Sequence, residues 1–455
     1  MMTKTLQQII LIFSCIYSFC FSLQSQIISG PMLTYVEFRT AKIWLEVEPG
    51  SQVSLKYWPK ATPANIKLAT KTLNKKFEFE TLLFDLNGLE PGTPYEYAIY
   101  TQKKKPAISL GSFSTQEYWK WRKPAPDFSF ITGSCSYVND PPYDRPGRAY
   151  GGDSLIYLTM AKEPVPFMLW LGDSWYTRES DYFSEWGLWY RASHHRRYPH
   201  LQGLWKSMSH LGIWDDHDYG PNDGDLSYIF KEESRNVFIA YFGNPSYGMD
   251  GKGTYTKFSY GDVDIFLLDD RTWRSSDRML DSINGQINAD KRMFGREQMD
   301  WLKNALLTSN APFKIIANGS QILNPVTRFD CLRHFPAEYQ ELMDFFQSHK
   351  VPGIVFLTGD RHKSEIVAIQ RDNQYTLYDI TTSALSAGIA KSTGDEVNLP
   401  ERVAGSLFED HNYARFSFSG KFKERKMKVD FVNKLGDNKF TWEISELDLR
   451  NKEGN

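Results

Sequence analysis

The middle and C-terminal parts of the chain contain short apolar runs that each end in a cluster of polar residues, and this pattern constrains the fold most strongly. Stretches with helical periodicity separate several of the runs, for example the one from Arg296 to Leu307. Alternating strands and helices predict an α/β layer structure, and polar residues at strand ends indicate where its functional site lies. The runs are FSFITGSCS from Phe128, FMLWLGDSWY from Phe167, LGIWDDHDYG from Leu211, VDIFLLDDRTWR from Val263, FKIIANGSQ from Phe313 and GIVFLTGDRH from Gly353.

The N-terminal part of the chain, before these runs, predicts an all-β unit. Ile43, Leu45 and Val47 occupy alternate positions of one run, and a Pro-Gly turn precedes Tyr95 and Tyr97 on one face of another predicted strand. The latter segment resembles a strand of fibronectin III-like domains, so we predict a small β-sandwich with a packing or positioning role.

The first 26 residues have the layout of a secretory signal. Lys4 supplies a charged start, and the stretch from Ile9 to Phe21 is almost wholly apolar. This core is short for a membrane span, which favours a cleaved signal over a signal anchor, and no later window is apolar enough to cross a bilayer. We therefore expect a secreted or periplasmic monomer. Its net charge of −2 gives no support to nucleic-acid binding driven by electrostatics.

The cysteines allow two interpretations. Cys15 and Cys20 would leave with the signal, so that Cys135 and Cys331 remain. Two cysteines in an oxidising compartment ordinarily form a disulfide. Cys135, however, follows one of the apolar runs, at a predicted strand end, where a metal ligand could also lie.

The predicted strand ends bring together residue types that suit phosphoester chemistry. Two metal ions a few ångströms apart can neutralise the anionic oxygens of a phosphoester and lower the pKa of a bound water. Such a site needs a bridging carboxylate, flanking oxygen or nitrogen ligands and a proton donor. The strand ends deliver Cys135, Asp173, Tyr176, Asp215, Asp216, His217, Asn318, Gln321, Asp360 and His362.

Four motifs, in this order along the chain, resemble the alkaline phosphatase D (PhoD-like) family of calcineurin-like metallophosphoesterases. They are GSC at 133–135, LGDSWY at 171–176, WDDHD at 214–218 and TGDRH at 358–362, with weaker matches in LLDDRTWR and in ITTSAL at 380–385. The resemblance implies a four-layer α-β-β-α sandwich and a metal-dependent hydrolase of phosphate esters. Together with the predicted signal at 1–26, it divides the chain into a β-sandwich at 27–118 and a catalytic domain at 127–455.

The resemblance also implies roles for individual residues. Asp173 would bridge two ions, Fe³⁺ and Ca²⁺, although other divalent metals are possible. An oxygen-rich set suits calcium, and anionic thiolate and phenolate donors suit ferric iron. The implied roles are ferric ligands at Cys135, Tyr176 and His362, ligands of the second ion at Asp216 and Asp360, a leaving-group acid at His217, and substrate contacts at Asn222 and Arg361. The segment from Asn318 to Gln321 lacks the histidine of many related enzymes, which makes a di-zinc or di-manganese site less favoured.

Each of these residues also has a structural interpretation. Tyr176 could be a core aromatic, and Asp173 and Asp360 could be turn-capping residues. Arg145, Arg148 and Arg178 could grip phosphate or simply lie at the surface. The histidine pair at 194–195, with the surrounding arginines, is interpreted as a solvated helix face.

An alternative function is a non-catalytic exported protein that binds a glycan or another polymer. An exported nuclease is disfavoured by the lack of a basic stripe.

Overall fold

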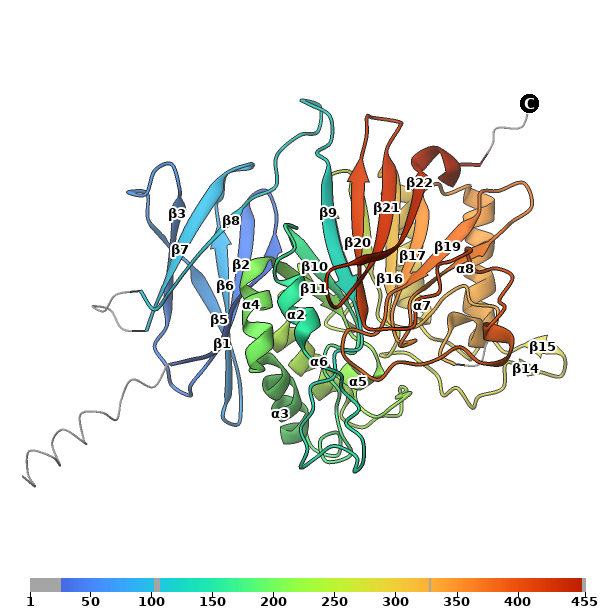
Figure 1. The fold of residues 1–455 in the computed structure, drawn as a ribbon, viewed down its shortest axis with the longest axis horizontal. Coiled ribbons are helices and arrows are strands. Elements are labelled where there is room, and N and C mark those ends of the chain that lie inside the picture. Colours follow the sequence, from blue (N-terminus) through green and yellow to red (C-terminus); the bar gives the residue numbers. More distant parts are fainter. Residues whose placement is uncertain (1–25, 102–106, 327–328, 452–455) are drawn as a thin grey trace, which may run out of the picture.

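Two large β-sheets form the centre of the computed structural model, which describes residues 26–101, 107–326 and 329–451 (Figure 1). The predicted signal therefore lies outside the described residues except for its last position. The larger sheet has the strand order β22 (Asn438–Ser445), β21 (Lys426–Asn433), β20 (Asn412–Ser419), β9 (Phe128–Gly133), β10 (Phe167–Leu171), β11 (Ser209–Ile213), β1 (Ile27–Val36), β2 (Thr40–Val47), β6 (Phe79–Asn87) and β5 (Thr70–Lys76). The second has the order β12 (Thr256–Tyr260), β13 (Val263–Leu267), β16 (Phe313–Asn318), β17 (Ile354–Thr358), β19 (Leu377–Thr381) and β18 (Glu365–Ile369).

Helices cover the outer faces of the two sheets. The α-helices are α2 (Leu155–Met160), α3 (Glu185–Arg196), α4 (Gln202–Ser207), α5 (Asp216–Tyr219), α6 (Lys231–Tyr241), α7 (Gly295–Thr308) and α8 (Pro336–His349). Short 3-10 helices span Pro199–Leu201, Leu332–His334, Gly394–Glu396 and Glu446–Leu449. None of the described helices has the length and apolar character needed to span a bilayer.

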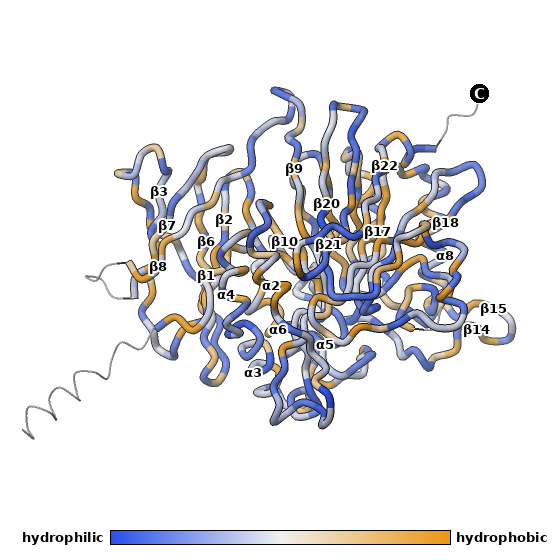
Figure 2. Tube along the Cα trace, viewed as in Figure 1, coloured by the Kyte–Doolittle hydropathy of each residue, from blue (hydrophilic) through white to orange (hydrophobic). Residues whose placement is uncertain are grey.

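Alternation of side chains along the strands assigns each face of the large sheet to a different core. Leu169 and Leu171 of β10 point into the space between the two sheets, whereas Met168 and Trp170 pack with the residues of α2, α3, α4 and α6. This follows from the two-residue period of a strand. The tube in Figure 2 shows many of the apolar segments in the strands of the sheets.

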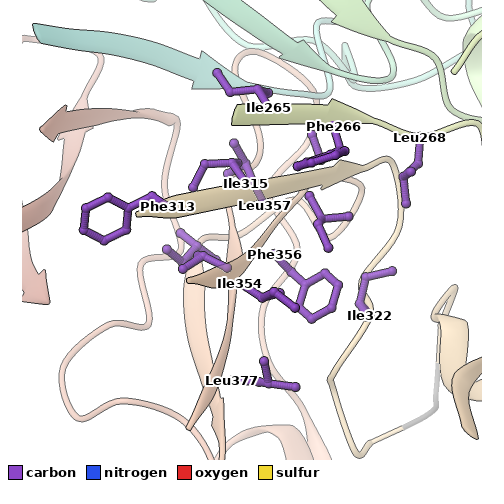
Figure 3. Close-up of a cluster of buried hydrophobic side chains, with 14 of the residues drawn as sticks. Ile265, Phe266, Leu268, Phe313, Ile315, Ile322, Ile354, Phe356, Leu357 and Leu377 are labelled. Carbon is purple, nitrogen blue, oxygen red and sulfur yellow. The ribbon is translucent and has the colours of Figure 1, made fainter. Parts of the chain in front are cut away.

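The second sheet likewise separates two layers. Phe313 of β16 contacts Phe418 of β20 across the space between the sheets, while Phe356 of β17 meets Phe346 of α8 on the outer side. Figure 3 shows the packing within this cluster, where Ile265, Ile315, Leu357 and their neighbours interdigitate. The layer order is thus helices, ten-stranded sheet, six-stranded sheet and helices, and the predicted mixed α/β fold is confirmed.

The N-terminal strands join the large sheet. β1 pairs in parallel with β11, at Leu33 and Ser209, so β1, β2, β6 and β5 extend that sheet. A separate four-stranded sheet has the order β4 (Lys67–Leu68), β3 (Ser54–Pro59), β7 (Pro94–Tyr100) and β8 (Ser109–Ser114). The two N-terminal sheets share a hydrophobic cluster that contains Ile43, Tyr95 and Tyr97. The likeness to a fibronectin III-like sandwich and the domain limits remain predictions.

Most predicted elements lie where the sequence places them. The helix predicted from Arg296 to Leu307 is α7, and the predicted strand with Tyr95 and Tyr97 is β7. A further small hairpin, β14 (Ser282–Ile283) and β15 (Gln286–Ile287), projects at one end of the molecule (Figure 1). Since β9, β10 and β11 run parallel, as do β13, β16 and β17, the loops that follow these strands gather at the same edges of the two sheets.

Candidate metal centre

Four of the predicted metal ligands lie just beyond the carboxyl ends of three strands, in tight turns. Cys135 follows β9, Asp173 follows β10, and Asp360 and His362 follow β17. All four have left-handed backbones, with φ of 60°, 51°, 63° and 54°. Such angles are uncommon outside glycine and cluster at functional sites, where surrounding contacts enforce them.

Two glycines allow these turns to approach one another. A Cβ at Gly172 would lie 2.5 Å from the Cβ of Asp215, and one at Gly359 would lie 2.7 Å from the Ser134 hydroxyl. Any side chain at either position would push two strand ends apart. The Gly-Asp pairs of the sequence therefore reflect close packing of the loops around the site.

The first group of donor atoms comes from Cys135, Asp173 and His362, which offer ligand atoms within 4.8 Å of one another. The Cys135 Sγ lies 3.6 Å from Asp173 Oδ2, and the Tyr176 hydroxyl lies 3.0 Å from His362 Nε2. His362 Nδ1 contacts the carbonyl of Gly388, so the hydrogen bond on that side leaves Nε2 to face the group.

The second group comprises Asp173, Asp216 and His217, again within 4.8 Å. Asp173 thus belongs to both groups. The backbone N–H of His217 donates to Asp173 Oδ1 at 3.3 Å, and the His217 ring packs against the Tyr176 ring, tilted by 30° with 4.1 Å between centroids. Among the described residues, the buried Nδ1 of His217 has no hydrogen-bond partner.

Asp216 is held by its neighbours in the loop and the helix that follow β11. Asp223 donates its backbone N–H to Asp216 Oδ2 at 2.8 Å. Asp215 caps α5, and its carboxylate accepts a hydrogen bond from Arg271 Nε at 2.7 Å. Arg271 also reaches Asp330, and all three of these charged side chains are buried. Arg271 thus fixes the turn from which Asp216 projects.

The electrostatics of the site favour a cation. Burial raises the pKa of Asp173 well above its usual range, and the charges of Asp216 and Cys135 add to the rise. Burial, with the charge of Asp330 next, raises the pKa of Asp360 to about 7, and burial raises that of Cys135 to about 11. Burial alone would also raise the pKa of Asp216, but His217, Arg271 and the Asp223 N–H outweigh it and hold that pKa below its usual value. A positive ion would relieve the repulsion among these acidic groups.

The donor set fits two different ions. A thiol, a phenol, an imidazole and a carboxyl group surround one position and would suit a transition metal once deprotonated, whereas two of the three donors at the other position are carboxyl groups. His217 Nδ1, Asp215 Oδ2 and Asn318 Oδ1 are buried without hydrogen-bond partners in the described part of the chain. Unpartnered polar atoms of this kind are expected where an ion or its water binds.

Other predicted site residues lie farther from these groups or have partners. The two donor groups do not include Asp360, although its charge acts on Cys135. Arg361 is buried, with its guanidinium 2.6 Å from Glu396 and stacked on Phe329. The exposed Asn222 donates to its neighbour Asp223.

Two of the other candidate arginines, Arg178 and Arg145, also have carboxylate partners. Arg178 is buried against Asp144 at 2.7 Å, and the exposed Arg145 pairs with Glu179 at 2.6 Å. In this structure, the guanidinium groups of both residues therefore neutralise acidic side chains of the chain itself.

Two interpretations drawn from the sequence, the solvated helix face and the alternative disulfide, are wrong. The charged face of α3 is not solvated, because Arg191, His195 and Arg196 are buried where α3 packs beneath the large sheet. Arg191 pairs there with Asp181 at 2.7 Å. The alternative disulfide is also absent: Cys135 and Cys331 are free thiols in the described residues, and the Cys331 sulfur contacts backbone carbonyls instead.

Sequence reasoning gave no role to two residues that touch the site. The Tyr150 hydroxyl lies 3.2 Å from His362 Nδ1, and the Ser383 hydroxyl lies 3.0 Å from the Cys135 sulfur. Ser383 lies within the weak ITTSAL match, which was the only signal for it. Nothing local in the sequence marks Tyr150.

Comparison with known proteins identifies the family. A family model described as PhoD-like phosphatase matches residues 130–431, well over half of the chain. The chain belongs to the PhoD-like phosphatase family. The resemblance inferred from the four motifs is therefore confirmed. A second model, a domain of unknown function (DUF7800), matches residues 24–111 of this PhoD-like chain.

Individual relatives agree with this assignment. Alkaline phosphatase D of Bacillus subtilis (strain 168) is 23% identical over 322 residues, which cover 62% of this chain and 53% of that protein. The chain thus spans about half the length of this curated relative.

Solved structures support the fold. The structure of PhoD superposes with a TM-score of 0.74 at 16% identity and covers 95% of this chain and 94% of its own. A purple acid phosphatase, PPD1 from yellow lupin (Lupinus luteus) seeds, gives 0.65 at 11% identity, covering 91% and 74%. These likenesses show that the chain shares its fold with both structures.

Proposed function

We propose that this protein hydrolyses phosphate esters with two metal ions that share Asp173. The observation that carries the proposal is the membership of Asp173 in both donor groups, each within 4.8 Å. Two ions bound in this way would polarise the phosphoester and supply a hydroxide near neutral pH. The relatives named phosphatases support the reaction class.

The chain's own residues would divide the remaining work. Cys135, Tyr176 and His362 would hold one ion, which we propose to be ferric, and Asp216 and Asp360 the other, which we propose to be calcium. His217 would face the leaving group and donate its proton, because its backbone N–H is held by Asp173 and Asp216 while the ring Nδ1 has no partner among the described residues. Asn222 is proposed to contact substrate. Arg361 could do so only after leaving Glu396.

The test combines metal analysis with activity. We expect about two metal ions per chain, and hydrolysis of bis-p-nitrophenyl phosphate or p-nitrophenyl phosphate that disappears on chelation. Asp173→Asn should lower activity by more than about 100-fold, because even residues that only support a ligand cost 10- to 100-fold. Full activity in Asp173→Asn protein freed of metal would contradict the proposal.

Export is part of the proposal and has its own measurement. Expression of the full chain followed by N-terminal sequencing of the extracytoplasmic protein should show cleavage near residue 26. A protein found only in the cytoplasm with its original N-terminus would refute export without affecting the proposed chemistry.

A further inference from the structure

We infer that Ser383 positions and tunes the metal centre by donating a hydrogen bond to the sulfur of Cys135. This inference rests on the proposed role of Cys135 as a metal ligand. The two residues are far apart in the sequence, but the loop after β19 brings the Ser383 hydroxyl to 3.0 Å from Sγ. Both side chains are fully buried, so water does not compete for the sulfur.

The available protons identify Ser383 as the donor. Its hydroxyl accepts the backbone N–H of His362 at 2.9 Å, which leaves its single proton for the sulfur. Ser134 also approaches Sγ, at 3.3 Å, but its hydroxyl lies closer to the carbonyl of Thr382, at 3.0 Å. Tyr176 packs in the same small buried cluster as Cys135, yet as a phenolate ligand it has no proton to give.

The backbone of Ser383 is held from both sides, so its hydroxyl has a defined direction. Its N–H donates to the Ser364 hydroxyl at 3.2 Å, and its carbonyl accepts from Asn412 Nδ2 at 3.1 Å. Ser364 in turn donates to Asn412 Oδ1 at 2.7 Å. This buried network makes one hydroxyl the link between two ligands of the same ion, Cys135 after β9 and His362 after β17.

The physical consequence concerns the metal–sulfur bond. A hydrogen bond to a thiolate withdraws electron density from the sulfur and so raises the energy of charge transfer from sulfur to metal. It also orients the ligand, and loss of such supporting partners typically weakens metal binding about 10- to 100-fold. The Ser383 hydroxyl should therefore affect both the absorption band and the affinity.

The experiment loads purified full-length protein with cobalt(II) as the probe and records the thiolate charge-transfer band. We expect Ser383→Ala to move the band to longer wavelength and to weaken cobalt binding about 10- to 100-fold in competition with a chelator. Ser134→Ala is the matched control, because it removes a second hydroxyl near the sulfur, at 3.3 Å, whose proton we assign to the Thr382 carbonyl, and its band should stay in place. Ser383→Thr should restore the wild-type band. An unchanged band and affinity in Ser383→Ala would overturn the inference.

Two further measurements keep the outcomes distinct. Cys135→Ser should abolish the band; if wild-type protein has no such band, Cys135 is not a ligand, and both that part of the proposed function and this inference fail. If the band is present but does not change in Ser383→Ala, the role of Ser383 is refuted, while the role of Cys135 as a ligand stands. If Ser383→Ala does not fold, resonance Raman spectra of the cobalt-loaded wild type in H₂O and D₂O test the hydrogen bond directly. The metal–sulfur stretch shifts on exchange when the sulfur accepts a hydrogen bond, and an unshifted stretch would overturn the inference.

Discussion

Arg271 offers the sharpest test of how the centre is supported. Its guanidinium is buried and binds Asp215 at 2.7 Å and Asp330 at 2.7 Å. In Arg271→Met, Asp215 would remain buried without its cation, whereas Asp330 would keep its ion pair with Arg274. Removing one partner of a buried ion pair costs about 3–5 kcal/mol, so we expect the free energy of unfolding to fall by about this amount.

Arg296 provides a matched control, since it also contacts two carboxylates. It binds Asp300 at 3.0 Å and Glu341 at 3.1 Å, but its side chain is 51% exposed. Exposed pairs contribute about 0–1 kcal/mol, so Arg296→Met should change stability little. Urea denaturation of both variants in metal-depleted protein measures the difference and removes any contribution from a bound ion.

The pH dependence of the Arg271 variant has a defined sign. Burial already raises the pKa of Asp215 well above its usual 3.8, and the Arg271 charge opposes this rise, so losing the guanidinium should raise the pKa of Asp215 further. The folded variant then binds more protons than the unfolded chain above about pH 4, and its stability falls as pH increases. The deficit against wild type should thus be larger at pH 8 than at pH 5. A loss no greater than that of Arg296→Met would refute this reasoning.

Three other variants test separate parts of the molecule. His217→Ala should retain its metal but lose activity about 10²- to 10⁴-fold, with a smaller loss for p-nitrophenyl esters, whose leaving group needs less protonation; loss of the metal instead would make it a ligand. Tyr176→Phe should remove any visible phenolate band from the iron-loaded protein, and an unchanged spectrum would exclude Tyr176 as a ligand. Trp44→Ala should lower the free energy of unfolding by about 3–5 kcal/mol. The buried indole packs between the N-terminal strands and α6, and it donates to the Ala240 carbonyl at 2.8 Å. A change below about 1 kcal/mol in urea denaturation would show that this contact is unimportant.

Several features of the site could be predicted because their signals are local. Asp173 and Asp360 each follow a glycine that ends an apolar run, and His362 comes two residues after Asp360. Parallel strands place such turns at one edge of a sheet, which is enough to expect a shared site. The structure adds that Asp173 belongs to two donor groups, a fact that no spacing along the chain contains.

The wrong interpretation of α3 and the missed residues Tyr150 and Ser383 have a different cause, because their contacts are with distant parts of the chain. The charges of α3 appeared to form a solvated face, since a helix with arginines and histidines ordinarily faces water. Arg196 instead stacks against Trp175 and Trp205, which belong to other elements. Such burial depends on which surfaces the fold brings together, and the helix itself carries no sign of it.

The sequence alone determined the types and order of the elements and the residue types at the strand ends, because the period of side chains along a strand or helix is a local property. Only the tertiary structure decided which side chains meet. The order of strands in the two sheets places Ser383 against Cys135 across 248 positions and Arg271 against Asp215 across 56. These contacts depend on chain topology and close packing, which arise only when distant segments fold against one another.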